Sequence, residues 1–185
     1  QWSFSFKEML TFIIPSSLGF GGQLYWGNMP FTDYPNYTGI IIIIFAILGF
    51  LKSNINRNHK ILFSLIIIFS LLLSFGKNLM FFYEMFYNWM PLFNKFRSPV
   101  FILILFNFSI YIYSSFGIDY FFENFKNKHK NILFLKVISA FLFFNIFIYF
   151  TYNIFLPTNI NLSKYRLLLE NDLFSISIIL ILLLL

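Results

Sequence analysis

Long apolar stretches separated by short polar segments dominate the sequence. A transmembrane helix needs about 20 mostly apolar residues, and no stretch shows the alternation of period two that a membrane β-barrel requires. The pattern predicts an all-α fold, a polytopic transmembrane helical bundle with four complete spans and a truncated fifth. The predicted spans cover about residues 37–51, 61–75, 99–118, 132–156 and 173–185.

The predicted helical region occupies residues 37–185, and residues 1–36 form a separate segment. Glycines and prolines recur between residues 19 and 39, which favours a turn-rich loop over a continuing helix. The chain starts without a signal peptide and closes on an apolar run without flanking charge. We therefore expect an internal piece of a longer polytopic protein.

The connection between the second and third predicted spans has a pattern of its own. Its polar side chains recur at intervals of seven, four and seven residues. They are Lys77, Glu84, Asn88 and Lys95. On a helix these positions form one narrow polar stripe among aromatic residues, and such a helix lies in the membrane surface. The pattern predicts an interfacial helix at about residues 78–90.

Two basic loops set the expected orientation in the membrane. Residues 52–60 carry three positive charges and no acid, and residues 119–131 contain Lys126, Lys128 and Lys130. Basic loops mark the cytoplasmic side of a membrane protein. The segment at 1–36 and the interfacial helix are therefore expected to face outward.

Composition excludes a soluble protein. Hydrophobic residues make up 59% of the chain and charged residues 11%, against about 25% charged residues in an ordinary soluble domain. A net charge of +6 would suggest nucleic-acid binding in a soluble protein, but here the basic residues lie in short loops and set topology. The expected partners are membrane lipids, and no nucleic-acid partner is predicted.

General signatures of catalysis are absent from the sequence. The chain has no Cys, and its two histidines, His59 and His129, lie in basic loops as solvated side chains, so no metal site and no cofactor are predicted. Asp33 and Glu84 are outer acids near aromatic residues and either could be a general base, so the catalytic residue stays unknown. The aromatic residues around Asp33 suit a sugar-binding surface or an interfacial aromatic belt, and composition favours the belt.

Polar residues inside the predicted spans are rare. Asn107 and Asn145 fall near the middle of the third and fourth spans. An amide group without a partner in hydrocarbon is costly. Both side chains are therefore predicted to face protein, and one possible arrangement pairs them with each other.

Cations on the outer side need an explanation because they depart from the positive-inside trend. Lys95 and Arg97 directly precede the third span. Arg97 suits bidentate contact with phosphate, whereas Lys77 and Lys95 act as point charges. Two alternatives stay open, which are nonspecific binding of lipid headgroups and binding the phosphate of a lipid-linked substrate.

Two blocks of residues resemble the YfhO-like family of bacterial membrane proteins, over about residues 1–100. The first block contains Gln1-Trp2-Ser3, Ile14-Pro15, Gly21-Gly22, Tyr25-Trp26-Gly27, Pro30-Phe31-Thr32, Pro35, Tyr37 and Gly39. The second contains Ser74-Phe75-Gly76-Lys77-Asn78 and Pro91-Leu92-Phe93-Asn94-Lys95-Phe96-Arg97. The last 85 residues match only as hydrophobic helices.

The resemblance implies the central membrane part of a protein similar to GT-C-fold glycosyltransferases in the bacterial cytoplasmic (inner) membrane. Such enzymes use a polyprenyl-phosphate sugar donor, and relatives are linked to glycosylation of envelope glycans. The family's catalytic acid is expected in a loop outside this chain, so the fragment alone is expected to be inactive. The resemblance assigns five residues to the donor-phosphate side of a cavity, namely Trp26, Lys77, Asn94, Lys95 and Arg97.

The alternative from another class is a non-enzymatic polytopic protein, such as a lipid or polymer transport component. Transporters place ionisable residues at the bilayer midplane, often on broken helices. The predicted spans contain only one charged residue, Lys136, which lies near the end of a span. This scarcity of charge weakens the transport alternative.

Overall fold

The computed structural model describes most of the chain as helices. The described residues are 2–21, 24–30, 32, 35–89, 93–95, 98–124, 132–155 and 162–184. Their α-helices are α1 (Ile40–Lys52), α2 (Arg57–Ser74), α3 (Met80–Trp89), α4 (Leu103–Asn124), α5 (Ile132–Phe155) and α6 (Leu162–Leu184). Short 3-10 helices are η1 (Lys7–Phe12), η3 (Gly76–Leu79), η4 (Phe93–Lys95) and η5 (Pro99–Ile102).

Four helical stretches are long and apolar enough to cross a membrane. They are Arg57–Ser74, Pro99–Asn124, Ile132–Tyr152 and Lys164–Leu184. Fewer than a third of the residues in each stretch are buried inside the protein, so most of their apolar side chains are free to contact lipid. The chain is a multi-pass membrane protein, and the predicted all-α polytopic bundle is confirmed.

Two predicted spans differ from the helices that form. The stretch at 37–51 gives α1, which has only 13 residues, because Thr38 N and Gly39 N donate to the carbonyl oxygen of Phe12 at 3.2 and 3.3 Å. The residues before α1 therefore fold back into the bundle instead of continuing the helix. The truncated span predicted at 173–185 is the second half of a longer helix, α6. The first turns of α6 contain charged residues, which lie outside the predicted span.

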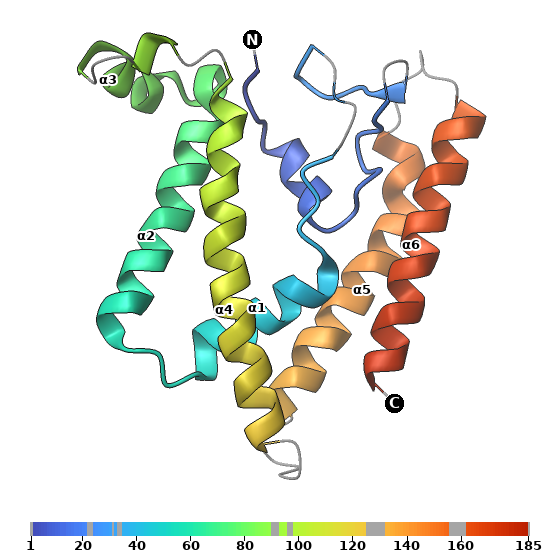
Figure 1. Cartoon of the computed structure of the whole chain (residues 1–185). Helices are drawn as coiled ribbons and strands as arrows, with labels where there is room; N and C mark the ends of the chain where they lie inside the picture. Colours follow the sequence, from blue (N-terminus) through green and yellow to red (C-terminus); the bar gives the residue numbers. More distant parts are fainter. Residues whose placement is uncertain are drawn as a thin grey trace.

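The N-terminal segment, residues 2–39, is the main non-helical part of the bundle. It runs between α4 and the α5–α6 pair, level with one half of the spanning helices (Figure 1). Its side chains Phe4, Ile14 and Leu18 are buried. Irregular backbone at this depth is stable only when protein covers it, and the packing of these side chains provides that cover.

Helices α1 and α4 cross in backbone contact at two glycines. A Cβ atom added at Gly49 would overlap the carbonyl oxygen of Tyr113, and one added at Gly117 would overlap the carbonyl oxygen of Phe45. Small residues at a crossing let two helix backbones approach closely. This contact holds α1 against α4 although α1 is too short to span.

Both interior asparagines face protein, as predicted. The Thr38 hydroxyl donates to Asn107 Oδ1 at 2.7 Å. Asn145 is 3% exposed, and the Ser177 hydroxyl of α6 lies 3.4 Å from its Oδ1. The two amides thus contact different partners and do not pair with each other.

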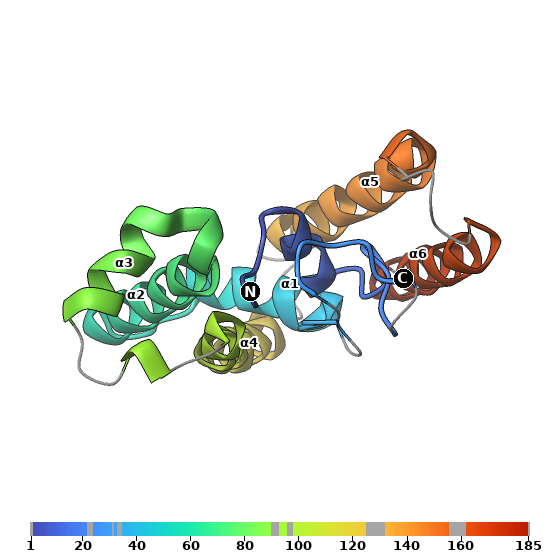
Figure 2. The ribbon, with the colours of Figure 1, turned by 90° about the horizontal axis from the view of Figure 1, so that it is seen from above.

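Helix α3 lies across the end of α2, at a large angle to the spanning helices (Figures 1 and 2). The rings of Phe82 and Phe86 pack against Phe69 of α2, with centroid distances of 6.3 and 5.4 Å. Phe81 and Trp89, on another face of α3, are almost fully exposed. This arrangement fits the helix expected at 78–90, and its place in the membrane surface stays a prediction.

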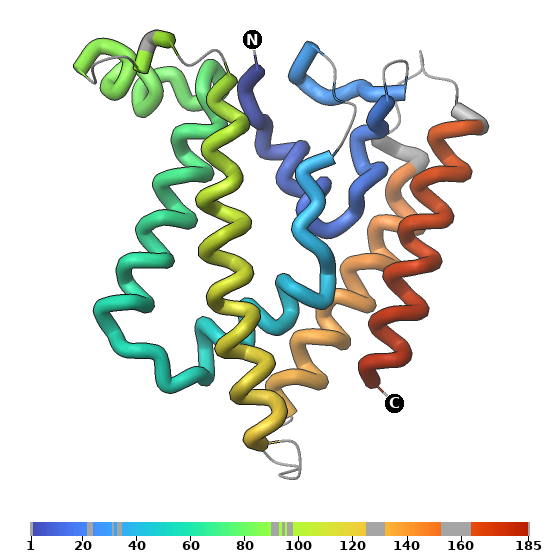
Figure 3. Tube along the Cα trace, in the orientation of Figure 1, coloured from blue at the N-terminus to red at the C-terminus, as the bar shows by residue number. Residues whose placement is uncertain are grey.

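The ends of the helices divide between the two ends of the bundle. The C-termini of α1 and α4 and the N-termini of α2 and α5 lie at one end, while α3 and the N-terminus of α6 lie at the other (Figure 3). Residues 52–56 therefore lie at the end opposite α3. The other predicted basic loop, residues 119–131, starts later than expected, because residues 119–124 continue α4. Residues 125–131, which include His129, are outside the described residues.

Candidate functional site

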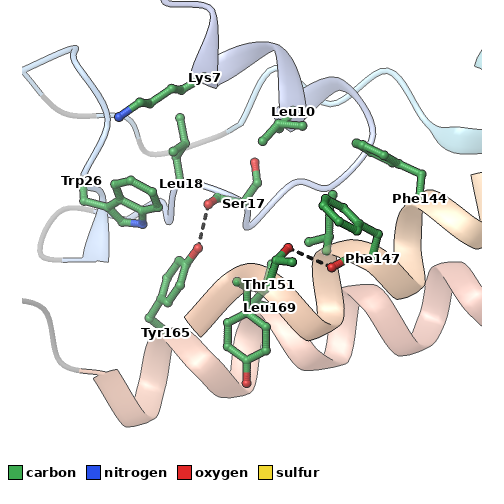
Figure 4. A pocket seen from close by; sticks show the side chains of 12 residues that line it. Lys7, Leu10, Ser17, Leu18, Trp26, Phe144, Phe147, Thr151, Tyr165 and Leu169 are labelled. Atoms are coloured by element: carbon green, nitrogen blue, oxygen red, sulfur yellow. Dashed lines mark hydrogen bonds between the residues drawn. The ribbon is translucent and has the colours of Figure 1, made fainter. Parts of the chain in front are cut away.

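A cavity of about 340 Å³ lies between the N-terminal segment and helices α5 and α6 (Figure 4). We call it the inner cavity. Apolar side chains form most of its wall, and the polar groups come from the N-terminal segment and the ends of α5 and α6. Its lining residues are Lys7, Leu10, Ser17, Leu18, Trp26, Phe144, Phe147, Ile148, Thr151, Tyr152, Tyr165 and Leu169.

Hydrogen bonds to α6 hold the wall that the N-terminal segment contributes. The carboxylate of Asp172 accepts from the backbone N–H of Ser16 at 2.9 Å and also from its hydroxyl. The Tyr165 hydroxyl donates to the carbonyl oxygen of Ser17 at 2.6 Å. A carboxylate that accepts two hydrogen bonds makes a stronger link than a neutral acceptor, so α6 fixes the position of residues 16–18.

Trp26 enters the same wall through a backbone contact. The backbone N–H of Trp26 donates to the carbonyl oxygen of Leu18 at 3.0 Å. Its ring meets the Tyr165 ring edge to face, with centroids 6.2 Å apart and planes at 78°. This geometry is favourable for an aromatic pair and aims the indole toward the cavity.

Three hydrogen-bond donors belong to the polar part of the inner cavity. Ser17 Oγ and Trp26 Nε1 are buried and have no hydrogen-bond partner of normal geometry among the described residues, although the Trp26 indole N–H lies close to the Tyr165 hydroxyl oxygen. Lys7 is exposed at the edge of the cavity. Buried polar atoms without a partner are costly and call for an explanation. A ligand group rich in acceptor oxygens would satisfy all three donors.

The apolar part of the cavity comes mainly from α5. Phe144, Phe147 and Ile148 line it, and Phe147 is also half exposed on the outer surface of the helix. The hydroxyl of Thr151 is already used, because it donates to the carbonyl oxygen of Phe147 at 2.8 Å. This wall therefore offers contacts to a hydrocarbon chain rather than to a polar group.

A buried acid lies behind the cavity. Glu8 is 1% exposed, and its carboxylate accepts from the backbone N–H of Ser5 at 2.6 Å and from the Tyr25 hydroxyl. Burial and the hydrogen bond to Glu8 raise the pKa of Tyr25 well above its ordinary value. Sequence interpretation overlooked Glu8, although a single acid among Phe4, Phe6 and Phe12 was a visible signal.

A second cavity, with a more polar wall, lies beside η3 and α3, and we call it the rim groove. It has a volume of about 270 Å³ and is lined by Ser3, Lys77, Met80, Tyr83, Glu84, Tyr87 and Pro99. Ser3 reaches it because Gly76 leaves no Cβ atom in the way; a Cβ atom there would overlap Ser3 Oγ. The hydroxyl of Ser3 accepts from the backbone N–H of Lys77 at 3.0 Å.

The predicted site residues fall in different places. Trp26 lines the inner cavity and Lys77 lines the rim groove, so the structure does not bring these two together. Lys95 is exposed in η4. Arg97, the side chain of Asn94 and the candidate acid Asp33 lie outside the described residues.

The described residues offer no metal site. No group of three His, Cys, Asp or Glu side chains within them could hold an ion. The two cavities have a different chemistry. The inner cavity is mostly apolar with hydrogen-bond donors, and the rim groove carries one cation and one anion.

Two residues from the blocks quoted for the expected YfhO-like resemblance contact each other in the structure. The backbone N–H of Lys77 in the second block donates to the hydroxyl of Ser3 in the first block at 3.0 Å. No family model, curated protein or solved structure matches the chain. The resemblance therefore rests on these residue blocks alone.

Proposed function

We propose that the chain is the central membrane part of a glycosyltransferase that uses a lipid-phosphate-linked sugar donor. It works in the bacterial cytoplasmic membrane on an acceptor glycan of the cell envelope. The observation that carries the proposal is the inner cavity, which combines a mostly hydrocarbon wall with two buried donors, Ser17 and Trp26, and with Lys7 at its edge. A lipid phosphate has the complementary chemistry, because its chain is apolar and its phosphate oxygens only accept hydrogen bonds.

The donors have distinct roles in this proposal. The ammonium group of Lys7 attracts the phosphate as a point charge, while the indole N–H of Trp26 and the hydroxyl of Ser17 orient it. During transfer, the acceptor hydroxyl oxygen bonds to the anomeric carbon as the bond from that carbon to the phosphate oxygen breaks. The electron pair of the broken bond leaves with the lipid phosphate, and Lys7 stabilises its added charge.

The proton of the acceptor hydroxyl goes to a general base. We assign no described residue to this role, since the Glu8 carboxylate is already hydrogen-bonded to Ser5 and Tyr25 and is buried away from the cavity lining. The family resemblance expects the acid in a loop outside this chain.

A non-enzymatic transport component is the second candidate, and one observation favours it. Helix α1 starts within the bundle, after non-helical chain that lies level with the spans. Discontinuous helices of this kind are common at the substrate sites of transporters. Both candidates require a bound lipid phosphate, and they differ in whether a sugar is transferred.

Binding is tested with farnesyl phosphate as the probe and farnesol as the uncharged control. The chain has three tryptophans, so Trp2→Phe with Trp89→Phe leaves Trp26 as the only tryptophan. We expect farnesyl phosphate to change Trp26 emission at concentrations about tenfold lower than farnesol, and Lys7→Gln to remove this difference, because one charge-assisted contact is lost. Lys52→Gln, at the opposite end of the bundle, is the matched control. Equal binding of both probes contradicts the proposal.

Transfer is tested with the full-length protein and a polyprenyl-phosphate donor that carries a radiolabelled sugar. We expect label to appear in envelope glycan and to be lost in Lys7→Gln, while Lys52→Gln retains it. Saturable binding of farnesyl phosphate without any transfer would favour the transport candidate.

A further inference from the structure

The rim groove carries one positive and one negative side chain in the same hollow. Lys77 and Glu84 both line it and both are exposed. Within the described part of the chain, no ion pair joins them. We infer that the rim groove binds a zwitterionic phospholipid, with the lipid phosphate at Lys77 and the lipid ammonium group at Glu84. This inference is independent of the inner cavity and of glycosyl transfer.

An apolar cavity adjoins the rim groove and supplies the place for an acyl chain. Its volume is about 410 Å³, and it shares Tyr83 and Pro99 with the groove. The rest of its wall comes from Ser98, Phe93 of η4 and apolar residues of α2, η5 and α4. A charged hollow next to a hydrocarbon slot matches a molecule with a headgroup and a chain. A free sugar or a free phosphate would leave the slot unfilled.

The position of the groove in the bundle agrees with a headgroup site. Helix α3 lies across the end of α2 (Figures 1 and 2), where a spanning helix meets the headgroup layer. Tyrosine is enriched at this level of membrane proteins, and Tyr83 and Tyr87 both line the groove. Phe81 and Trp89 are almost fully exposed on α3, as expected for a helix that lies in the membrane surface.

The groove is held in shape without a ligand. The bond from Lys77 N to Ser3 Oγ and the bond from the Asn78 amide to Phe4 O join η3 to the N-terminal segment. The rings of Phe82 and Phe86 fix α3 on α2. A preformed site binds more tightly because less conformational freedom is lost on binding.

The charges in the groove discriminate between headgroups. A phosphodiester accepts hydrogen bonds from the Lys77 ammonium group, and a primary ammonium donates to the Glu84 carboxylate. The rings of Tyr83 and Tyr87, with centroids 6.2 Å apart, line the same groove, and an aromatic ring is a favourable neighbour for an ammonium group. A headgroup that has a phosphate but no ammonium leaves Glu84 unpaired and is repelled by it. The groove therefore favours phosphatidylethanolamine over phosphatidylglycerol.

The test is native mass spectrometry of the full chain in detergent, titrated with phosphatidylethanolamine or phosphatidylglycerol that carry the same acyl chains. We expect phosphatidylethanolamine to bind about tenfold more tightly, the size of effect that one charge-assisted contact gives. Glu84→Lys should reverse the preference, and Lys77→Glu should abolish binding of both lipids. Glu123→Lys and Lys52→Glu, at the other end of the bundle, are the matched controls.

A second set of measurements separates a lipid site from other outcomes. Glu84→Gln conserves size and should lose the preference without reversing it, which covers the case that the charge-reversal variant does not fold. Soluble phosphoethanolamine should compete weakly, because it lacks the acyl chain. Equal affinity for both lipids, no effect of either Glu84 variant, or competition by phosphoethanolamine as strong as by the whole lipid would each overturn the inference.

Discussion

The side of the bundle that holds α1 and α4 and the side that holds α5 and α6 are built in opposite ways. On one side, α1 and α4 touch backbone to backbone at Gly49 and Gly117. On the other side, the N-terminal segment separates α4 from α5 and α6 and is tied to α6 by Asp172 and Tyr165. On the first side the crossing itself is closed because the glycines have no side chain, and an apolar cavity of about 310 Å³ lies beside it between α1, α2 and α4. The second side contains the inner cavity, which has buried polar atoms in its wall.

The difference explains where a cavity with polar groups can form in this bundle. Helices in backbone contact leave no space at their crossing, and the cavity beside it is lined almost entirely by apolar side chains. Non-helical chain between helices must satisfy its polar groups with side chains inside the bundle, here the buried Glu8 and Tyr165 and the half-buried Asp172. Its irregular outline also leaves space unfilled. The segment that needs these hydrogen bonds is therefore the same segment that forms one wall of the cavity, which we propose as the functional site.

The largest effect is expected from Gly117→Ala on the closed side. The added Cβ atom would overlap the carbonyl oxygen of Phe45, and a backbone atom cannot rotate away, so α1 must move. Overpacking costs about 1–3 kcal/mol and occasionally more, and we expect a loss of stability at the upper end of this range. Thermal unfolding in detergent measures it. Ser115→Ala, on the exposed face of the same helix, is the control. An unchanged melting temperature would contradict the backbone contact.

An intermediate effect is expected from Asp172→Ala on the side with the cavity. Ser16, which is buried, loses two hydrogen bonds, and leaving buried donors unsatisfied costs about 1–3 kcal/mol. The chain has no cysteine, so Ser17→Cys reports on the opening of this side through its rate of labelling by a soluble maleimide. We expect Asp172→Ala to increase that rate about tenfold, since local opening follows the lost free energy.

The matched reporter for the closed side is Ser109→Cys, because Ser109 is fully buried on α4. Its labelling rate should stay the same in the Asp172→Ala background. If both reporters become equally reactive, the two sides open as one unit and the comparison between them fails.

The smallest effect is the pH dependence contributed by Tyr25. Burial and Glu8 raise the pKa of its hydroxyl, so the folded protein holds the phenol proton more tightly than the unfolded chain does. The resulting stability is complete below about pH 10, the ordinary pKa of tyrosine, and is lost as the pH rises above it. Tyr25→Phe should therefore show a smaller fall in melting temperature between about pH 9 and about pH 11 than the unsubstituted protein does. Tyr37→Phe, at an exposed position, should leave that fall unchanged.

Local hydropathy was enough to predict the helices but not their limits. The isoleucine run that starts at Ile40 predicted a span, yet the bonds from Thr38 and Gly39 to Phe12 stop the chain from extending it as a helix. The charged residues before 173 predicted a loop. In the structure Glu170 accepts from the Tyr152 hydroxyl at 2.8 Å, and Asp172 accepts from Ser16. Both departures come from partners far away in sequence, which a hydropathy pattern does not contain.

The sites were predictable to different degrees for the same reason. The spacing of seven residues put Lys77 and Glu84 on one stripe, and both line the rim groove. The selection of Trp26 rested on a family resemblance, and Trp26 lines the inner cavity. Lys7 and Glu8 were missed because the segment at 1–36 was predicted as a loop. Only its folding between α4 and α6 makes Glu8 buried and brings Lys7 to the cavity.

The length of α2 has a consequence for the membrane that surrounds the protein. Its 18 residues span about 27 Å at 1.5 Å per residue, and α3 lies across its end, so this helix cannot extend further on that side. Helix α4 with η5 provides 26 residues and has length to spare. The hydrocarbon thickness that the protein accepts is therefore set by its shortest span. In a bilayer much thicker than about 30 Å, lipids must thin around α2.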